Sequence, residues 1–253
     1  MQLLTTNAKL DKRIHGIDAD IVGLSLAPAT HSGHNLCPYS TPGCRAICNL
    51  WFSGRTVQTI VRTAMVRRSL MLINTPELFA QDLASDLETL ARRCKRNQSR
   101  AFVRLNTASD IDYARQFPGV IDLAGSLNIQ LYDYTKAIAR CEREIDNWEY
   151  QLTYSWNEKS DPYRVRNLLN AGGNVAMVFD TVYNPQHGRI DPLPKSWNIG
   201  DQEFLVVDGD TMDVRTAEFD GSGVIVGLRG KGGRKKVKEG VQSGFILETG
   251  GAE

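Results

Sequence analysis

The chain alternates between short apolar runs and longer stretches with a polar or helix-like pattern. Seven of the apolar runs have the length of a strand and are rich in β-branched and aromatic residues. The predicted strands are Ile21–Ala27, Ala101–Asn106, Asn128–Asp133, Tyr150–Trp156, Asn174–Phe179, Glu203–Val207 and Gly223–Leu228. Because a helix-like stretch follows most of them, the pattern predicts parallel βαβ units.

The longest helix-like stretch separates the first two predicted strands, and it predicts two helices. The first starts near Gly54. The second begins at Pro76, with Thr75 as its cap, and runs to about Arg96. The remaining predicted helices are Ile111–Gln116, Thr135–Trp148 and Asp161–Ala171. The prolines between Thr181 and Gly200 predict a loop.

Seven such units in 253 residues favour an α/β fold, and more narrowly a complete or partial (βα) barrel with parallel strands. We expect one barrel-like domain over residues 1–253. In a (βα) barrel the chemistry lies on the loops that follow the carboxyl ends of the strands. Polar and ionisable residues follow each predicted strand here, so these loops are the candidate site, although strands also simply end in polar turns.

Composition narrows the class of protein. The chain is 42% hydrophobic and 23% charged, with a net charge of +1, which is typical of a globular domain and excludes a disordered, collagen-like or coiled-coil chain. A nucleic-acid contact would therefore need a local basic patch. No apolar run reaches the roughly 18 residues of a membrane span. The first residues have no secretory signal pattern, so we expect a cytoplasmic protein.

Three of the five cysteines, Cys37, Cys44 and Cys48, lie on one short loop after the first predicted strand. In a reducing compartment this clustering favours a metal site over disulfides. A structural zinc would take His31 or His34 as a fourth ligand, whereas an iron–sulfur cluster with three cysteines leaves one iron open. Three thiols packed as small hydrophobes are the remaining interpretation.

The cysteine loop resembles that of the radical S-adenosylmethionine superfamily. Its Thr41-Pro42-Gly43-Cys44 segment is similar to a group of phage-encoded proteins that resemble the same superfamily. The resemblance implies a [4Fe–4S] cluster on the three cysteines, S-adenosylmethionine on the open iron, an electron donor, and a place in the host cytoplasm.

The loop also departs from the superfamily pattern. Six and then three residues separate its cysteines, where the superfamily has three and then two, and no Gly-Gly-Glu follows the second predicted strand. Asn106, Ser109 or Asp110 would have to bind the methionine amine instead.

Other predicted strand ends carry further candidate groups. Asp133 and Lys136 could move a proton if burial shifted their pKa, although Lys136 could equally open a helix. Ser155 offers a polar contact, and Trp156 offers a surface on which a base or an adenine ring could stack. Two carboxylates after the sixth strand are suited to ribose hydroxyls or an amine, or form a plain acidic turn. These are Asp208 and Asp210.

A basic, glycine-rich segment at 229–240 is the kind of local patch that a nucleic-acid contact would need. Clustered cations and glycine amides favour phosphate oxygens, so nucleic acid or a nucleotide is the expected partner, while a solvated surface is the alternative. The predicted contacts are Arg229, Lys231, Arg234, Lys235 and Lys236. We expect His15 and His187 to be exposed loop residues rather than ligands.

The sequence therefore leads to one favoured function and two alternatives. The favoured function is an iron–sulfur enzyme that resembles radical S-adenosylmethionine proteins and modifies a nucleic acid or nucleotide in a phage context. The first alternative is a zinc-containing barrel enzyme that acts on nucleic-acid bases. The second is a nucleic-acid-binding protein whose metal is structural.

Overall fold

The protein is an α/β domain, described here from a computed structural model that covers residues 1–6, 16–48, 50–51, 54–184, 189–231 and 233–250. His15 and His187 lie outside this part of the chain. The strands are β1 Leu4–Thr5, β2 Ala19–Leu24, β3 Arg100–Arg104, β4 Ile129–Thr135, β5 Tyr150–Ser155, β6 Asn174–Asn184, β7 Arg189–Ile190, β8 Ser196–Ile199, β9 Gln202–Asp208, β10 Ile225–Gly230 and β11 Ile246–Leu247.

The helices cover the sheet and connect most of its strands. They are α1 Pro42–Ala46, η1 Gly54–Val57, α2 Thr59–Asn74, α3 Pro76–Asn97, α4 Tyr113–Gln116, α5 Pro118–Ser126, α6 Ile138–Arg143, α7 Pro162–Asn170, α8 Ala217–Asp220 and α9 Gly233–Gln242. Among the described residues, no helix is long and apolar enough to cross a membrane.

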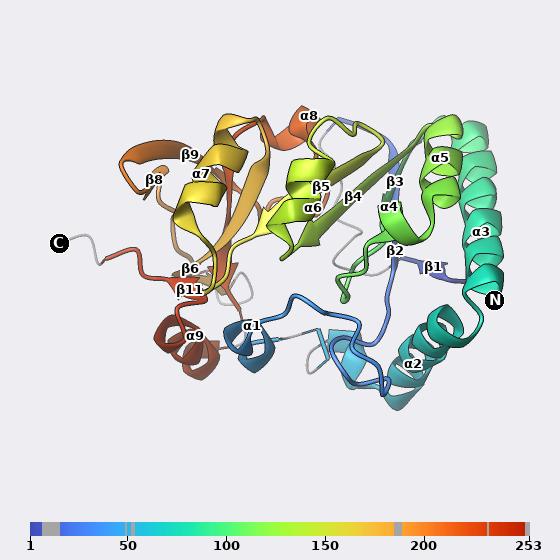
Figure 1. Cartoon of the computed structure of the whole chain (residues 1–253), viewed down its shortest axis with the longest axis horizontal. Helices are drawn as coiled ribbons and strands as arrows, with labels where there is room; N and C mark the ends of the chain where they lie inside the picture. The colour runs from blue at the N-terminus through green and yellow to red at the C-terminus, as the bar shows by residue number, and fades with distance from the viewer. Residues whose placement is uncertain (7–15, 49, 52–53, 185–188, 232, 251–253) are drawn as a thin grey trace.

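The sheet is mostly parallel and runs in the order β1-β2-β3-β4-β5-β6-β10-β9-β8 (Figure 1). Strands β2 to β6 are neighbours in chain order and all pair in parallel, as βαβ units require. The order then changes, because β10 lies between β6 and β9 and is parallel to both. Within the described residues β8 does not pair with β1, so the sheet is open.

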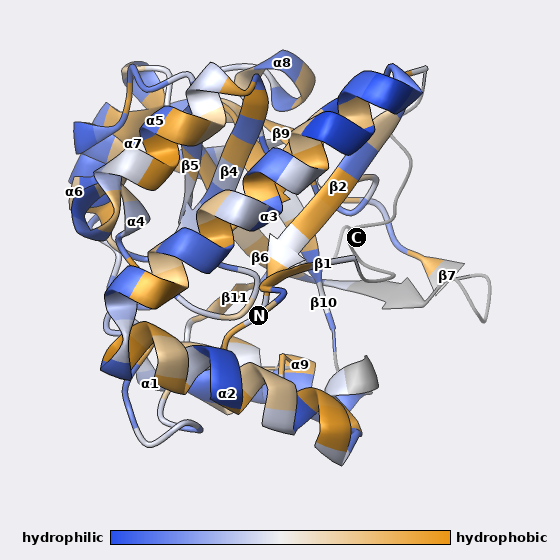
Figure 2. Cartoon of the chain, turned by 90° about the vertical axis from the view of Figure 1, so that its right-hand side faces the viewer, coloured by the Kyte–Doolittle hydropathy of each residue, from blue (hydrophilic) through white to orange (hydrophobic). Residues whose placement is uncertain are grey.

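Helix α3 shows how the sequence builds the outer layer. Pro76 occupies its first turn, and Gln98 ends it in the left-handed region at φ 56°. Its apolar side chains recur at helical spacing and are buried against the face of β2, β3 and β4 that carries Val22, Val103 and Leu131. Figure 2 shows this helix with alternating apolar and polar surfaces. Helix α7 packs in the same way over β5 and β6.

The opposite face of the sheet holds the segment that joins β9 to β10. Val214 packs there against Phe102 and Tyr132, which alternate along their strands with the residues that face α3. Arg104 on the same face is 6% exposed, and its Nη1 lies 3.0 Å and 3.1 Å from the two carboxylate oxygens of Asp213. The Asp213 carboxylate also accepts the hydroxyl of Tyr132. A buried ion pair thus ties this segment to the sheet.

Parallel strands place all their carboxyl ends at one edge of the sheet and their amino ends at the other. In Figure 1 helices α1 and α9 lie at the lower, carboxyl edge, while α8 lies at the upper, amino edge. The cysteine loop follows β2 and therefore lies at the carboxyl edge, together with the residues that follow β4 and β5. The topology thus brings together, at one edge of the sheet, the loops that we expected to carry the site.

The predicted strands are confirmed with shifts of at most five residues at their ends, and α3 is confirmed almost to the residue. Two of the predicted helices need correction. The helix predicted over Thr135–Trp148 is only α6, since β4 continues to Thr135. Ile111–Gln116 contains only α4, and α5 was missed. The predicted loop Thr181–Gly200 contains the end of β6 with β7 and β8, and the segment 229–240 is the end of β10 followed by α9.

The buried ion pair gives a stability prediction. Asp213→Ala should lower the free energy of unfolding by about 3–5 kcal/mol, because it leaves the buried Arg104 guanidinium without its counter-charge. Urea denaturation followed by circular dichroism measures this. Glu142→Ala is the control, since its ion pair with Arg164 is exposed and should be worth at most about 1 kcal/mol. Equal losses in both variants would contradict the structural role of Asp213.

Candidate active site at the carboxyl edge

The cysteine loop is held by hydrogen bonds within the loop and by a contact with the loop after β3. Thr41 caps α1 by accepting the backbone N–H of Cys44 at 3.2 Å, and Pro42 takes the first helical position. The Cys37 sulfur accepts the backbone N–H of Ala29 at 3.2 Å and lies 3.5 Å from the carbonyl oxygen of Ala108, in the loop after β3. The loop therefore folds back onto the neighbouring strand end.

Glu158, from the loop after β5, clamps the other end of the cysteine loop. Its carboxylate accepts the hydroxyl of Thr41 and the backbone N–H of Gly43, each at 2.8 Å. Burial opposes the ionisation of Glu158, but these two hydrogen bonds hold its pKa below the ordinary value. A side chain at Gly43 would place a Cβ 2.8 Å from the carboxylate, so any larger residue would have to displace Glu158.

The three thiols lie within electrostatic reach of one another. Burial and, to a smaller extent, the neighbouring Asp110, Cys44 and Cys48 together raise the pKa of Cys37 to about 11. Burial also raises the pKa of Cys44, while the ammonium of Lys136 works in the opposite direction. All three cysteines are free thiols. Among the residues that the structure describes, however, no three His, Cys, Asp or Glu side chains form a group that could hold a metal ion.

The two histidines considered as a fourth ligand lie on the exposed part of the same loop. The ring of His31 stacks on Trp51, with ring centroids 4.5 Å apart and planes within 11°. Arg62 packs over the same indole at 5.0 Å. His34 is exposed. The structure thus places His31 against an aromatic ring, and neither histidine belongs to a ligand group with the cysteines.

Lys136 directly follows β4, Ser155 is the last residue of the neighbouring β5, and the two side chains face each other. The Lys136 Nζ donates to the Ser155 hydroxyl at 2.9 Å and lies 4.5 Å from the ring centroid of Phe245. Burial lowers the pKa of Lys136, while the nearby Cys44 and Asp110 raise it. The structure therefore brings these two predicted residues together next to the cysteine loop. Trp156 packs instead against the core beneath α7.

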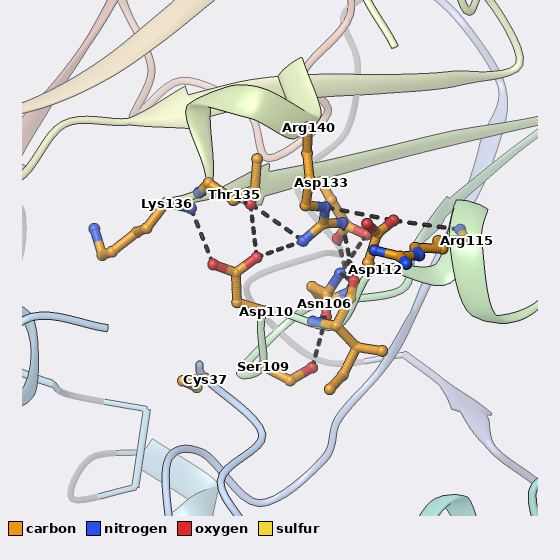
Figure 3. A network of polar contacts seen from close by, with 12 residues as sticks. Cys37, Asn106, Ser109, Asp110, Asp112, Arg115, Asp133, Thr135, Lys136 and Arg140 are labelled. Atoms are coloured by element: carbon orange, nitrogen blue, oxygen red, sulfur yellow. Dashed lines mark hydrogen bonds and ion pairs between the residues drawn. The ribbon is translucent and has the colours of Figure 1, made fainter. Parts of the chain in front are cut away.

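Asp110 joins the ends of β3 and β4 in the network of Figure 3. Its carboxylate accepts the Thr135 hydroxyl and the Arg140 guanidinium, both at 2.7 Å, and the backbone N–H of Lys136 at 3.0 Å. Asp110 and Arg140 are both buried. In Figure 3 the Lys136 side chain leaves this network and points away from it. Asp110 thus positions Lys136 through the backbone.

A buried hydrogen-bonded cluster next to Asp110 contains three of the predicted site residues, Asp133, Asn106 and Ser109. The Asp133 carboxylate accepts the backbone N–H of Asn106 at 2.6 Å and the hydroxyl of Tyr150 at 2.6 Å, and burial raises its pKa to about 6. The Asn106 side-chain oxygen accepts the Ser109 hydroxyl at 2.8 Å. Each of these three side chains has a partner inside the protein, and Asp133 is 0% exposed. Their contacts hold the loop after β3.

The two carboxylates predicted after β9 pair with two of the predicted nucleic-acid contacts. Arg229 donates to Asp208 at 2.8 Å and 2.9 Å and to Asp210 at 3.2 Å. Lys231 lies 2.7 Å from Asp210, which is 4% exposed. These four residues neutralise one another at the ends of β9 and β10, and the pairing joins the two strand ends.

The other predicted cations lie on α9. Arg234 and Lys235 are exposed, and Lys236 is half-buried. Helix α9 packs against α1, which carries Cys44 (Figure 1). The exposed positive charge is therefore beside the cysteine loop, at the same edge of the sheet.

Glu158 and Phe245 complete the surroundings of Lys136. The sequence contained a signal for Glu158, an acid after a strand end, but none for Phe245.

The chain belongs to the gene product 88 family, a phage-type family whose model matches residues 1–248. The expectation of a phage protein is thus confirmed at the level of the family. No curated protein and no solved structure matches the chain.

The clamp on the cysteine loop predicts an interaction between two substitutions. Gly43→Ala should lower the free energy of unfolding by about 1–2 kcal/mol, because the new methyl displaces the Glu158 carboxylate from two hydrogen bonds. In a Glu158→Ala background the same change should be neutral or should stabilise by up to about 1 kcal/mol, as alanine favours a helix. Chemical denaturation of the four proteins measures the cycle, and equal effects in both backgrounds would rule out the clamp.

Proposed function

We propose that the chain is a metal-dependent enzyme whose cysteine loop binds an iron–sulfur cluster at the carboxyl edge of an open, partial (βα) barrel. The observation that supports this most strongly is the position of Cys37, Cys44 and Cys48. They are free, half-buried thiols on one loop over the ends of parallel strands, within electrostatic reach of one another. Thiolates are the ligands that iron–sulfur clusters use.

Three cysteine thiols are suitable ligands for an iron–sulfur cluster. Their positions in the structure, however, are not those of an assembled metal site. Burial favours the neutral thiol of Cys37 and Cys44, so a metal would have to supply the positive charge that stabilises the thiolates. Since no group of three ligands is formed among the described residues, binding would draw the three sulfurs closer together. Cys48 lies beyond the end of the five-residue helix α1, where the backbone can adjust.

The residues around the loop have defined parts in this proposal. A cluster on the three cysteines would supply, as the resemblance implies, an electron for the cleavage of S-adenosylmethionine. Lys136 and Ser155 hold an ammonium and a hydroxyl 2.9 Å apart beside the cysteine loop, and they would orient a polar substrate or the carboxylate of a ligand. Asp110 fixes Lys136, and Glu158 fixes the loop. An external electron donor remains part of the proposal.

A nucleic acid or nucleotide is the proposed substrate. Helix α9 carries Arg234 and Lys235 on its exposed side and packs against α1, so phosphates bound there would lie next to the cysteine loop. Arg229 and Lys231 contribute less, because Asp208 and Asp210 neutralise them. The phage-type family is consistent with action on nucleic acid in a host cell.

Zinc is the alternative metal. Three cysteines with His31 or His34 would give the four ligands of a structural zinc site. The stack of His31 on Trp51 and the exposure of both histidines do not favour this arrangement. A protein that binds nucleic acid through α9 and uses zinc only for structure would share the basic surface but would not turn over S-adenosylmethionine.

Metal analysis tests the proposal directly. Protein purified without oxygen should be brown, absorb near 400 nm and contain about four irons per chain if the cluster is of the four-iron type. Cys37→Ala, Cys44→Ala and Cys48→Ala should each lose most of the iron. Cys94→Ala, on the buried face of α3, is the matched control and should retain it. Colourless protein with one zinc would overturn the iron–sulfur proposal and support the alternative.

Nucleic-acid binding is tested by charge removal on α9. The double variant Arg234→Gln/Lys235→Gln should bind fluorescently labelled single-stranded RNA or DNA more weakly and with a smaller salt dependence. The slope of log K against log salt should fall by about 0.7 for each lost phosphate contact. Arg92→Gln removes an exposed charge from α3 and should leave the anisotropy titration unchanged. Equal losses in both variants would argue against a site on α9.

A further inference from the structure

A second concave site lies at the amino edge of the sheet, opposite the cysteine loop. It is a cavity of about 360 Å³ between the start of β4, the start of β5 and the segment that contains α8. In Figure 1 this is the upper edge, where α8 lies. The residues that line it are Gln130, Trp148, Gln151, Thr216, Ala217, Glu218 and Ser222. None of them belongs to the site at the carboxyl edge.

Trp148 gives this cavity an exposed aromatic wall. Its side chain is 71% exposed, which is unusual for an indole, whose large apolar surface is normally buried. The residue is held through its backbone, because the Gln130 amide donates to the Trp148 carbonyl oxygen at 2.8 Å. Arg100 binds Glu218 with two hydrogen bonds of 2.7 Å, so the charge at the rim is neutralised. The cavity thus presents a ring surface without a net charge.

Thr216 gives the cavity a buried polar group without a partner. The residue is 3% exposed, and its hydroxyl has no hydrogen-bond partner among the residues that the structure describes. Such a group costs free energy unless a ligand or water satisfies it. Gln151 is fixed through its side-chain oxygen, which accepts the N–H of Ala217 at 2.7 Å. Within the described part of the chain, the Gln151 amide nitrogen is left as a donor and the Gln130 side-chain oxygen as an acceptor.

We infer that this cavity binds a nucleobase, which stacks on Trp148 and forms hydrogen bonds with Gln130, Gln151 and Thr216. A planar, uncharged ring with donors and acceptors on its edge matches an indole wall next to two fixed amides and a hydroxyl. Glutamine amides offer the paired donor and acceptor that adenine recognises. The cavity is large enough for one base and its sugar. This site does not depend on a metal at the other edge.

The test uses the full chain and adenosine, cytidine, guanosine and uridine as probes in titration calorimetry. At least one nucleoside should bind in the millimolar range or tighter. Trp148→Ala should weaken that binding about tenfold or more, because it removes the stacking surface. The fold should tolerate the change, since the exposed side chain is not part of the core and alanine keeps the carbonyl oxygen that Gln130 contacts. Leu205→Ala truncates another exposed apolar side chain, on β9, and should change nothing.

Thr216→Val provides a second, subtler variant, because it keeps the shape of the side chain and removes the hydroxyl. It should weaken the nucleoside about fivefold or more while leaving thermal stability unchanged or slightly higher. Cys44→Ala should bind the nucleoside as the unchanged protein does, which separates this site from the proposed metal centre. Binding that Trp148→Ala does not affect, binding of simple sugars with no nucleoside, or no binding at 5 mM would overturn the inference.

Discussion

One buried carboxylate fixes the geometry of the carboxyl edge. Asp110 accepts hydrogen bonds from Thr135, Arg140 and the backbone of Lys136, and so joins the loop after β3 to the end of β4. An ionised carboxylate away from water needs a partner of opposite charge, and the buried Arg140 guanidinium supplies it. The position of Lys136 beside the cysteine loop depends on this ion pair.

The same constraint separates the polar residues of the strand ends into two sets. Members of the first set bind one another and join elements that are distant in sequence, as Arg104 does with Asp213 and Arg229 with Asp208. Members of the second set lie beside the cysteine loop and join neighbouring strand ends, as Lys136 and Ser155 do through their hydrogen bond. A charged residue after a strand is therefore not by itself evidence of chemistry, because the sheet uses such residues to hold its own loops in place.

Local pattern predicted the elements well, because strand and helix periodicity depends on neighbours in sequence. The bounds of α3 follow from Pro76 and from its apolar spacing. The insertion of β10 between β6 and β9 could not be read in this way, since strand pairing is a property of distant segments. The pairing of Arg229 with Asp208 has the same origin. Helix α6 begins only at Ile138, after a bend at Lys136 whose N–H is bound by the distant Asp110.

The position of β10 also determines when the fold can be completed. Its parallel pairing with both β6 and β9 provides the link between the first six strands and the hairpin of β8 and β9. During synthesis β9 leaves the ribosome before β10 and at that moment has only β8 to pair with, as an exposed edge. The hairpin can join the sheet only when residues 225–230 are available, which makes the last step of folding a non-local and comparatively slow one.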